Sequence, residues 1–173
     1  VTWLGYPNTT GLSSINYRFT DTIADPIGQT EKYYSEKLFR LKNTFLCYKG
    51  NKNIINNLKS PFLKNNHITF GSFNNLTKIT PEIVRVWSEI LKNISKSRLI
   101  LKSPQNIENA NNYLQMFKDE GVNMKQIEFY GHLKNSHDHM ELYNNIDLCL
   151  DTFPYNGTTT TFESLWMGVP VIS

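Results

Sequence analysis

The sequence has few of the residues that would place it in a disulfide-rich, secreted or membrane class. Two cysteines in 173 residues, Cys47 and Cys149, are too few for a disulfide framework. Cys149 lies in an apolar run, which favours a buried thiol and a reducing, cytoplasmic location. No apolar run is long enough to cross a bilayer, and the first residues lack the features of a secretory signal. We therefore expect no membrane partner.

Several catalytic motifs are also missing. The sequence contains no G-x-G-x-x-G fingerprint, no G-x-x-x-x-G-K-[ST] loop and no G-x-S-x-G elbow, which argues against NAD enzymes, P-loop NTPases and α/β-hydrolases. No Cys/His spacing typical of zinc is present. His137, Asp138 and His139 are consecutive on a predicted helix, where neighbouring side chains point to different sides, so we expect no metal site. A net charge of +3 is too small to indicate a nucleic-acid partner.

What the sequence does contain is a globular composition, 39% hydrophobic and 19% charged. The first sixty or so residues are irregular. Two short apolar segments, residues 3–6 and 45–48, are predicted as buried strands, and turn signals separate them. Residues 49–66 are polar without a clear period, which is typical of a linker.

From residue 67 onward, strand and helix patterns alternate. Thr80 and Pro81 have the residue types of a helix cap and a first helical position. Five strands are predicted at residues 67–73, 98–101, 126–130, 146–151 and 169–172, with helices from 80, at 107–120, at 137–145 and at 161–167. This order predicts an α/β fold with a parallel, doubly wound sheet. In such a sheet the loops at 71–80, 131–137 and 152–160 open on one edge, where ligands bind.

The loop at 152–160 is the most informative of the three. Asn156-Gly157 is a turn signal, and a run of four threonines follows it. Hydroxyls and backbone N–H groups at a helix start suit a diphosphate, although they also suit a plain helix cap. Thr160 and Glu163 have the spacing of a capping box. An alternative role for Glu163 is to accept hydrogen bonds from a ribose. The sequence does not decide between diphosphate binding and helix capping for the threonines, or between capping and ribose binding for Glu163.

Two further side chains fall in these loops. Lys78 lies between the first strand and the first helix of the alternating region, where an ammonium group can stabilise a leaving phosphate. A solvated surface lysine is the alternative. His139 falls in the first turn of the third helix, with Ser136 as the predicted cap, and can donate a hydrogen bond to a phosphate or a base carbonyl.

Two long segments resemble a known family. Residues 70–81 (FGSFNNLTKITP) and 150–161 (LDTFPYNGTTTT) are similar to the donor-binding segments of the O-linked N-acetylglucosamine transferases, in a bacterial or SPINDLY-like form. Residues 3–7 and 34–38 resemble the end of that family's N-terminal lobe. The resemblance implies a two-lobed GT-B-like fold. Residues 1–64 would then be the end of the N-terminal lobe with a linker, and 65–173 the first part of a Rossmann-like nucleotide-sugar lobe.

The resemblance also implies an activity. The family transfers N-acetylglucosamine from UDP-N-acetylglucosamine to Ser or Thr of proteins, with inversion and without a metal or other cofactor. Two alternatives remain: the UDP-glucose-dependent N-glucosyltransferases related to it, and a non-catalytic UDP-binding fragment. The partners implied are a UDP-sugar donor, a protein acceptor and tetratricopeptide repeats upstream in the full-length chain. The sequence identifies no general base.

Site residues follow from the resemblance position by position. Lys78 matches the catalytic lysine on the leaving diphosphate, and Asn75 falls where animal members have Gln. His139 matches a histidine near the uridine and phosphate, and Glu163 matches an acidic residue on the ribose. The remaining matches lie in one loop and contact the nucleotide sugar: Asn156, Gly157, Thr158, Thr159 and Thr160.

The sequence departs from the animal members at two positions. Thr158 replaces a His, and Ser136 stands where they place a lysine against the uracil. Both departures point to the bacterial branch.

Overall fold

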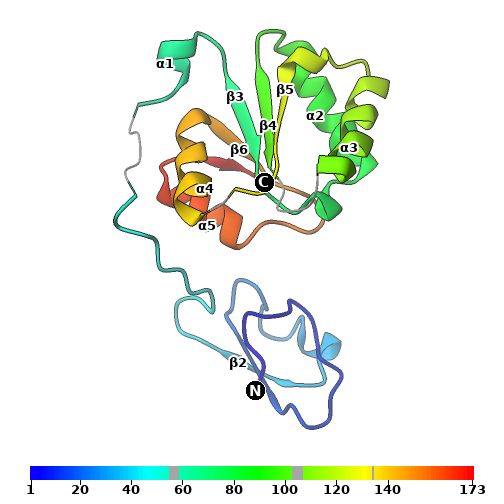
Figure 1. The fold of residues 1–173 in the computed structure, drawn as a ribbon. Coiled ribbons are helices and arrows are strands. Elements are labelled where there is room, and N and C mark those ends of the chain that lie inside the picture. Colours follow the sequence, from blue (N-terminus) through cyan, green and yellow to red (C-terminus); the bar gives the residue numbers. More distant parts are fainter. Residues whose placement is uncertain (55–58, 103–106, 134) are drawn as a thin grey trace. The chain divides into compact units, whose positions relative to one another are not determined.

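Two structural units make up the chain in the computed structural model, Val1–Lys49 and Gly50–Ser173 (Figure 1). The structure describes residues 1–54, 59–102, 107–133 and 135–173. In these residues no helix combines the length and the apolar character that crossing a bilayer requires. Whether the two units correspond to parts of two catalytic lobes stays a prediction.

The first unit is built on two short parallel strands, β1 (Tyr17–Thr20) and β2 (Lys37–Arg40). The strands predicted at 3–6 and 45–48 are wrong. Trp3 is about half exposed, and only Thr2 pairs with a strand, as an isolated bridge to Arg18. Hydrophobicity misleads here because β1 buries the polar side chains of Arg18 and Thr20. Arg18 Nη1 donates to the Tyr6 carbonyl and the Thr20 hydroxyl donates to Asp25, both in the surrounding loops.

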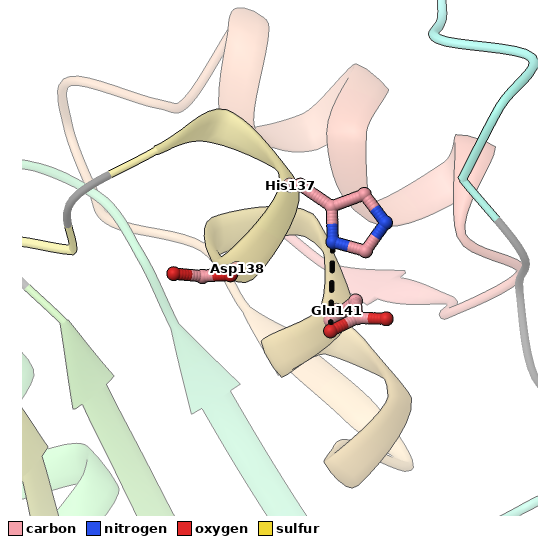
Figure 2. Close-up of side chains that lie close together, drawn as sticks. All are labelled: His137, Asp138 and Glu141. Carbon is pink, nitrogen blue, oxygen red and sulfur yellow. Dashed lines mark ion pairs between the residues drawn. The ribbon is translucent and has the colours of Figure 1, made fainter.

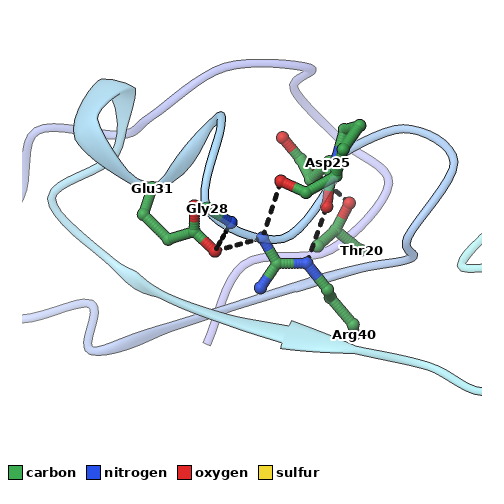
Figure 3. A network of polar contacts seen from close by, with 6 residues as sticks. Thr20, Asp25, Gly28, Glu31 and Arg40 are labelled. Carbon is green, nitrogen blue, oxygen red and sulfur yellow. Dashed lines mark hydrogen bonds and ion pairs between the residues drawn. The ribbon is translucent and has the colours of Figure 1, made fainter.

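A polar network holds the loops of this unit to β2 (Figure 3). Arg40 donates from Nε to the Asp25 carbonyl at 2.6 Å and from Nη2 to Glu31 Oε1 at 2.6 Å. Glu31 begins the single turn η1 (Glu31–Tyr33) and also accepts from the Gly28 amide at 3.2 Å. The Thr20 hydroxyl donates to the buried Asp25 carboxylate. Polar contacts therefore stabilise a unit in which two strands offer little apolar core.

The second unit is the predicted parallel sheet. Its five strands lie in the order β5-β4-β3-β6-β7, and every neighbouring pair is parallel. The strands are β3 (Thr69–Ser72), β4 (Arg98–Lys102), β5 (Ile127–Tyr130), β6 (Leu148–Leu150) and β7 (Val171–Ile172). The helices are α1 (Phe62–Asn65), α2 (Pro81–Asn93), α3 (Ile107–Asp119), α4 (Ser136–Leu142) and α5 (Thr159–Trp166), with single turns η2 (Leu76–Lys78), η3 (Met124–Gln126) and η4 (Tyr143–Asn145). The prediction of an α/β fold is confirmed, and α1 adds one turn to the expected linker.

Helices cover both faces of the sheet, with α2 and α3 on one side and α4 and α5 on the other (Figure 1). Strand β4 divides its side chains between the two cores: Leu99 and Leu101 pack in the cluster with α2 and α3, and Ile100 packs in the cluster with α4. In β6, Leu150 joins the first cluster and Cys149 the second. Burial on both faces explains the continuous apolar runs of these strands.

The helix starts agree with the sequence in one case and differ in another. Thr80 caps α2 by accepting from the Ile83 amide, and Pro81 occupies the first turn, as predicted. Ser136 does not cap α4. The cap is Asn135, whose side-chain oxygen accepts from the Asp138 amide at 2.8 Å. Both residue types make good caps, and the backbone at Asn135 is the extended one that a cap requires.

Candidate functional site

The candidate site lies where the strand order of the sheet reverses. The chain passes from β3 outward to β4 and β5, and then returns to the other side of β3 with β6 and β7. The loops that leave the carboxyl ends of β3 and β6 therefore diverge, at the usual ligand position in such sheets. Asn74, Asp151 and Thr160 are among the residues that line a small crevice there. The first of these loops carries Asn74 and Lys78, and the second runs from Asp151 to the start of α5.

Asp151 is the polar centre of this crevice. Its Oδ1 accepts from the backbone amides of Thr152 at 2.8 Å and Gly157 at 2.7 Å. Three side chains also donate to this carboxylate: Asn74 Nδ2 at 3.1 Å, Asn156 Nδ2 at 3.1 Å and Ser173 Oγ at 3.3 Å. One carboxylate thus fixes the shape of the loop that precedes α5.

Asn74 joins the two loops to each other. Its side chain is buried; the amide nitrogen donates to Asp151, and the oxygen accepts from Thr160 Oγ1 at 2.9 Å. Sequence reasoning missed both Asn74 and Asp151 as site residues. The available signal was their position, since each is a polar residue next to the carboxyl end of a strand whose flanking run is apolar.

Lys78 reaches from η2 to the second loop. Its Nζ donates to the Asn156 carbonyl at 3.0 Å and lies 4.2 Å from the centre of the Tyr155 ring. Partial burial lowers the pKa of Lys78, and the negative charge of Asp151 acts in the opposite direction. The ammonium is therefore tied to the segment that leads into α5 and is not a freely solvated surface group.

The start of α5 differs from the prediction. The helix begins at Thr159, and Thr158 occupies the cap position without a side-chain cap bond. The predicted capping box of Thr160 and Glu163 is wrong, because Thr160 Oγ1 donates to Asn74 and Glu163 pairs with His139. Thr158 and Thr159 are exposed. The side chains of Thr160 and Glu163 therefore bond partners in other elements, and Thr158 makes no side-chain cap bond to the first amides of α5.

His139 and Glu163 form a second polar pair beside this helix. His139 Nε2 lies 2.9 Å from Glu163 Oε2, and the side chains are 16% and 17% exposed. Phe73 and Tyr143 pack around the imidazole, with ring centres 5.7 and 5.6 Å away. Its Nδ1 is buried and has no hydrogen-bond partner in the part of the chain that the structure describes. Lys102 lies at the end of β4. Burial lowers the pKa of Lys102, and the negative charge of Glu163 acts in the opposite direction.

Asn75 has a local role that the sequence did not indicate. Its side-chain oxygen accepts from the Thr77 amide and hydroxyl, both at 3.1 Å, and so caps η2. The side chain is exposed. Contact between Asn75 and a donor stays a prediction.

A cluster of ionisable groups lies on the outer side of α4 (Figure 2). Potential ligand atoms of His137, Asp138 and Glu141 lie within 4.8 Å of one another, and all three residues are exposed. His137 Nδ1 is 3.6 Å from Glu141 Oε2, which is the ordinary spacing of an i,i+4 pair. His139 instead turns inward to Glu163, so the two histidines lie on different sides of the helix, as expected.

The structure therefore ties most of the predicted site residues to one segment, residues 156–163. Lys78 contacts it through Asn156, and His139 contacts it through Glu163. Gly157 fills a space that a side chain cannot share: an added Cβ would lie 2.9 Å from Asn74 Oδ1 and against Thr160 Oγ1. The roles of the predicted site residues in binding a nucleotide sugar stay predictions.

Comparisons with known proteins agree along the whole chain. The model of glycosyl transferase family 41 matches residues 1–62 and 49–173. The chain is 46% identical over 175 residues to a tomato protein (Solanum lycopersicum) named probable UDP-N-acetylglucosamine–peptide N-acetylglucosaminyltransferase SPINDLY, covering 100% of this chain and 19% of that protein. It is 34% identical over 182 residues to the Arabidopsis thaliana protein of the same type named SEC, covering 100% of this chain and 18% of that protein.

Two solved structures are similar to this chain. A variant of the O-GlcNAc transferase of Thermobaculum terrenum superposes with a TM-score of 0.87 at 32% identity, over 99% of this chain and 32% of that one. S. aureus TarM superposes with a TM-score of 0.59 at 14% identity, over 91% of this chain and 29% of that one, which shows a likeness of fold alone.

Proposed function

The chain belongs to glycosyl transferase family 41, and from this premise we propose that it forms part of the nucleotide-sugar-binding region of a protein glycosyltransferase. The reaction is transfer of N-acetylglucosamine from UDP-N-acetylglucosamine to Ser or Thr of an acceptor protein. The chain spans 19% of the length of its tomato relative, and we extend the activity in the relatives' names to it on the strength of the site. Upstream tetratricopeptide repeats and a cytoplasmic, bacterial setting belong to the same proposal.

One observation carries the proposal: Lys78 Nζ lies 3.0 Å from the carbonyl of Asn156, directly before the threonine segment at the start of α5. A diphosphate at this position would accept from the amides of residues 158–160, where the helix dipole is positive. The ammonium of Lys78 would then face the oxygen that leaves with the nucleotide. Catalysis would come from electrostatic stabilisation of the leaving group, and losing one such donor typically costs about 10²–10³ in kcat.

The nucleoside would lie toward α4. The Nδ1 of His139 is buried without a hydrogen-bond partner among the described residues, and in the proposed complex it would donate to a phosphate or a base carbonyl. Glu163 gives one oxygen to His139, and a carboxylate has about four lone-pair sites, so it can also accept from ribose hydroxyls. With Lys78 and the helix N-terminus supplying positive charge, the proposed reaction uses no metal.

Donor binding tests this proposal most directly. Calorimetry on the protein that contains this chain should compare UDP, GDP, UDP-N-acetylglucosamine and UDP-glucose. We expect UDP-N-acetylglucosamine to bind, and a peptide substrate to gain one N-acetylhexosamine by mass spectrometry. GDP is included because Ser136, at the start of α4, stands where the animal members of the family place a lysine against the uracil.

The other outcomes are equally specific. Tighter binding of UDP-glucose with modification of Asn would favour the N-glucosyltransferase alternative. Binding of UDP without any transfer would indicate a non-catalytic lobe. Preferential binding of GDP would contradict the uridine assignment while leaving the glycosyltransferase class in place.

A further inference from the structure

We propose that Asp151 is a positioning residue for sugar transfer: its carboxylate ties the loop after β3 to the loop after β6, and thereby holds Lys78 at the start of α5. The inference rests on the proposed function for its kinetic consequences. Its structural consequences can be measured in the protein without a donor.

The hydrogen bonds define what Asp151 does. One oxygen accepts from the backbone of Gly157, which begins the turn into α5, and from the side chain of Asn74, which belongs to the other loop. The other oxygen accepts from the side chain of Asn156. Because the carbonyl of Asn156 is the acceptor for Lys78, the position of the ammonium depends on the geometry that Asp151 imposes.

A neutral amide of the same shape cannot replace this carboxylate. Both oxygens of Asp151 face N–H donors: Oδ1 faces Asn74, Thr152 and Gly157, and Oδ2 faces Asn156. Asparagine has one acceptor oxygen and one NH₂ group. Whichever way it is turned, its NH₂ meets donors, and at least one hydrogen bond of the loop is lost. An Asp151→Asn variant should therefore loosen the loop even though it keeps the volume of the side chain.

The charge of Asp151 acts on Lys78 as well. Among the described residues, Asp151 is the charged group set against this ammonium, the titratable Tyr155 ring lies beneath it, and the Asn156 carbonyl accepts from it. Burial already lowers the pKa of Lys78, and the carboxylate opposes that effect. Removing the negative charge should lower the pKa of Lys78 further, so that less ammonium is present at alkaline pH.

Kinetics of three variants test the coupling: Asp151→Asn, Lys78→Ala and the double variant. We expect Asp151→Asn to lower kcat by about tenfold or more, with a smaller change in KM for the donor. The double variant should be no slower than Lys78→Ala, because the effect of Asp151 passes through Lys78. The alkaline limb of the kcat profile should move to lower pH in Asp151→Asn. Additive losses with an unmoved alkaline limb would overturn the proposal.

Asp147→Asn is the matched control. Asp147 lies at the opposite end of the same strand, where its carboxylate accepts from the amides of Phe62 and Thr69, both at 2.9 Å, and from the Ser60 hydroxyl. It is comparably hydrogen-bonded and remote from the crevice. We expect the pH profile of Asp147→Asn to match that of the unaltered protein; a shift equal to that of Asp151→Asn would attribute the effect to general destabilisation and overturn the proposal.

A measurement without turnover separates this inference from the proposed function. The pKa of Lys78 can be followed by NMR of ¹⁵N-labelled lysine side chains, with Lys78→Ala for assignment. Hydrogen exchange of the Gly157 amide reports on the loop. Asp151→Asn should lower the pKa of Lys78 and speed that exchange even if the protein transfers no sugar. An unchanged pKa with unchanged exchange would refute the positioning role whatever the activity.

Asn156→Ala keeps the inference testable if Asp151→Asn does not fold. Its side chain is exposed, and the substitution removes only the side-chain links to Asp151 Oδ2 and Ser173, leaving the carbonyl that Lys78 uses. We expect faster exchange at Gly157 in this variant as well. Unchanged exchange at Gly157 would contradict the proposal.

Discussion

His139 Nε2 lies 2.9 Å from Glu163 Oε2 and joins two helices, α4 and α5, that are separated by a strand in the sequence. Both side chains are largely buried, with exposed fractions of 16% and 17%, and the Nδ1 of His139 is buried without a hydrogen-bond partner among the described residues. The pair links the two helices on the side where we propose that the nucleoside binds. This arrangement makes the nucleoside side of the site testable separately from the leaving-group side.

Glu163→Gln should weaken donor binding more than it slows the chemical step. The substitution keeps the side-chain shape but replaces a charged acceptor, and hydrogen bonds to charged groups contribute about 1.5–3 kcal/mol. We expect KM for the donor to rise by about tenfold with kcat changed less, since a ribose contact acts equally in the ground and transition states. Glu141→Gln is the control, because Glu141 pairs with His137 on the outer side of α4. Equal effects in both variants would contradict the assignment.

Lys78→Ala should have the opposite kinetic signature. Removing the ammonium that faces the leaving group should lower kcat by about 10²–10³, while the protein stays folded. Lys92→Ala provides the comparison, since Lys92 lies near the end of α2 and pairs with Glu89 at 2.6 Å. Circular dichroism would check folding and single-turnover assays would measure transfer. Normal turnover by Lys78→Ala would show that the leaving-group role is misassigned.

Gly157→Ala tests how closely the loop packs under α5. The added methyl group would lie 2.9 Å from Asn74 Oδ1 and would also contact Thr160 Oγ1. Either the Asn74–Thr160 hydrogen bond breaks or the loop moves, so UDP affinity should fall. The loss of one hydrogen bond between the loop and the charged diphosphate would lower the affinity by about tenfold. Gly5→Ala is the control, because the nearest atom to its new methyl group is 3.9 Å away. Isothermal titration calorimetry of both variants would decide.

Glu36 should make the first unit sensitive to acid. Its pKa is lowered from 4.5 to about 2, chiefly by the hydrogen bond from the Thr10 hydroxyl, and also by the Thr10 amide and the Thr9 hydroxyl. A group with a lowered folded-state pKa contributes stability above its unfolded pKa and loses it as pH falls. The stabilisation should thus be complete above pH 4.5 and disappear as pH falls toward about 2.

Hydrogen exchange of the Thr10 amide, measured from pH 6 downward, would follow this loss after correction for intrinsic rates. Glu36→Gln should remove the pH dependence attributable to this carboxylate. If Glu36→Gln and the unaltered protein open identically with pH, Glu36 does not couple acid to the stability of this unit.

Removing metal ions should leave transfer unchanged. In the proposed mechanism the positive charge on the diphosphate comes from Lys78 and the amides at the start of α5, so a divalent cation has no part to play. Assays after dialysis against EDTA would measure this, with His137→Ala alongside to remove one member of the exposed cluster on α4. Loss of activity on chelation, restored by Mg²⁺ or Mn²⁺, would contradict a metal-independent reaction.

Local patterns in the sequence were sufficient for much of the second unit. Apolar runs bounded by turn residues predicted its strands, and Thr80-Pro81 predicted the start of α2, because caps and buried strands depend on residues close together in the chain. The same reasoning failed in the first unit. There β1 buries Arg18 and Thr20, and a polar strand is recognisable only once its distant hydrogen-bond partners are known.

The sequence by itself determined the α/β class, the family resemblance and the loops that carry Lys78 and the threonine segment. Only the tertiary structure decided which atoms those side chains meet. The Thr160–Glu163 spacing indicated a capping box. In the structure, Thr160 donates to Asn74, 86 residues away along the chain, and Glu163 pairs with His139, 24 residues away. The central position of Asp151 was also not predictable from the sequence, since its donors come from the loop after β3, from its own loop and from the end of the chain. The physical reason is that a short side chain bonds whatever partner the folded sheet brings within about 3 Å, and sequence spacing limits only the local candidates.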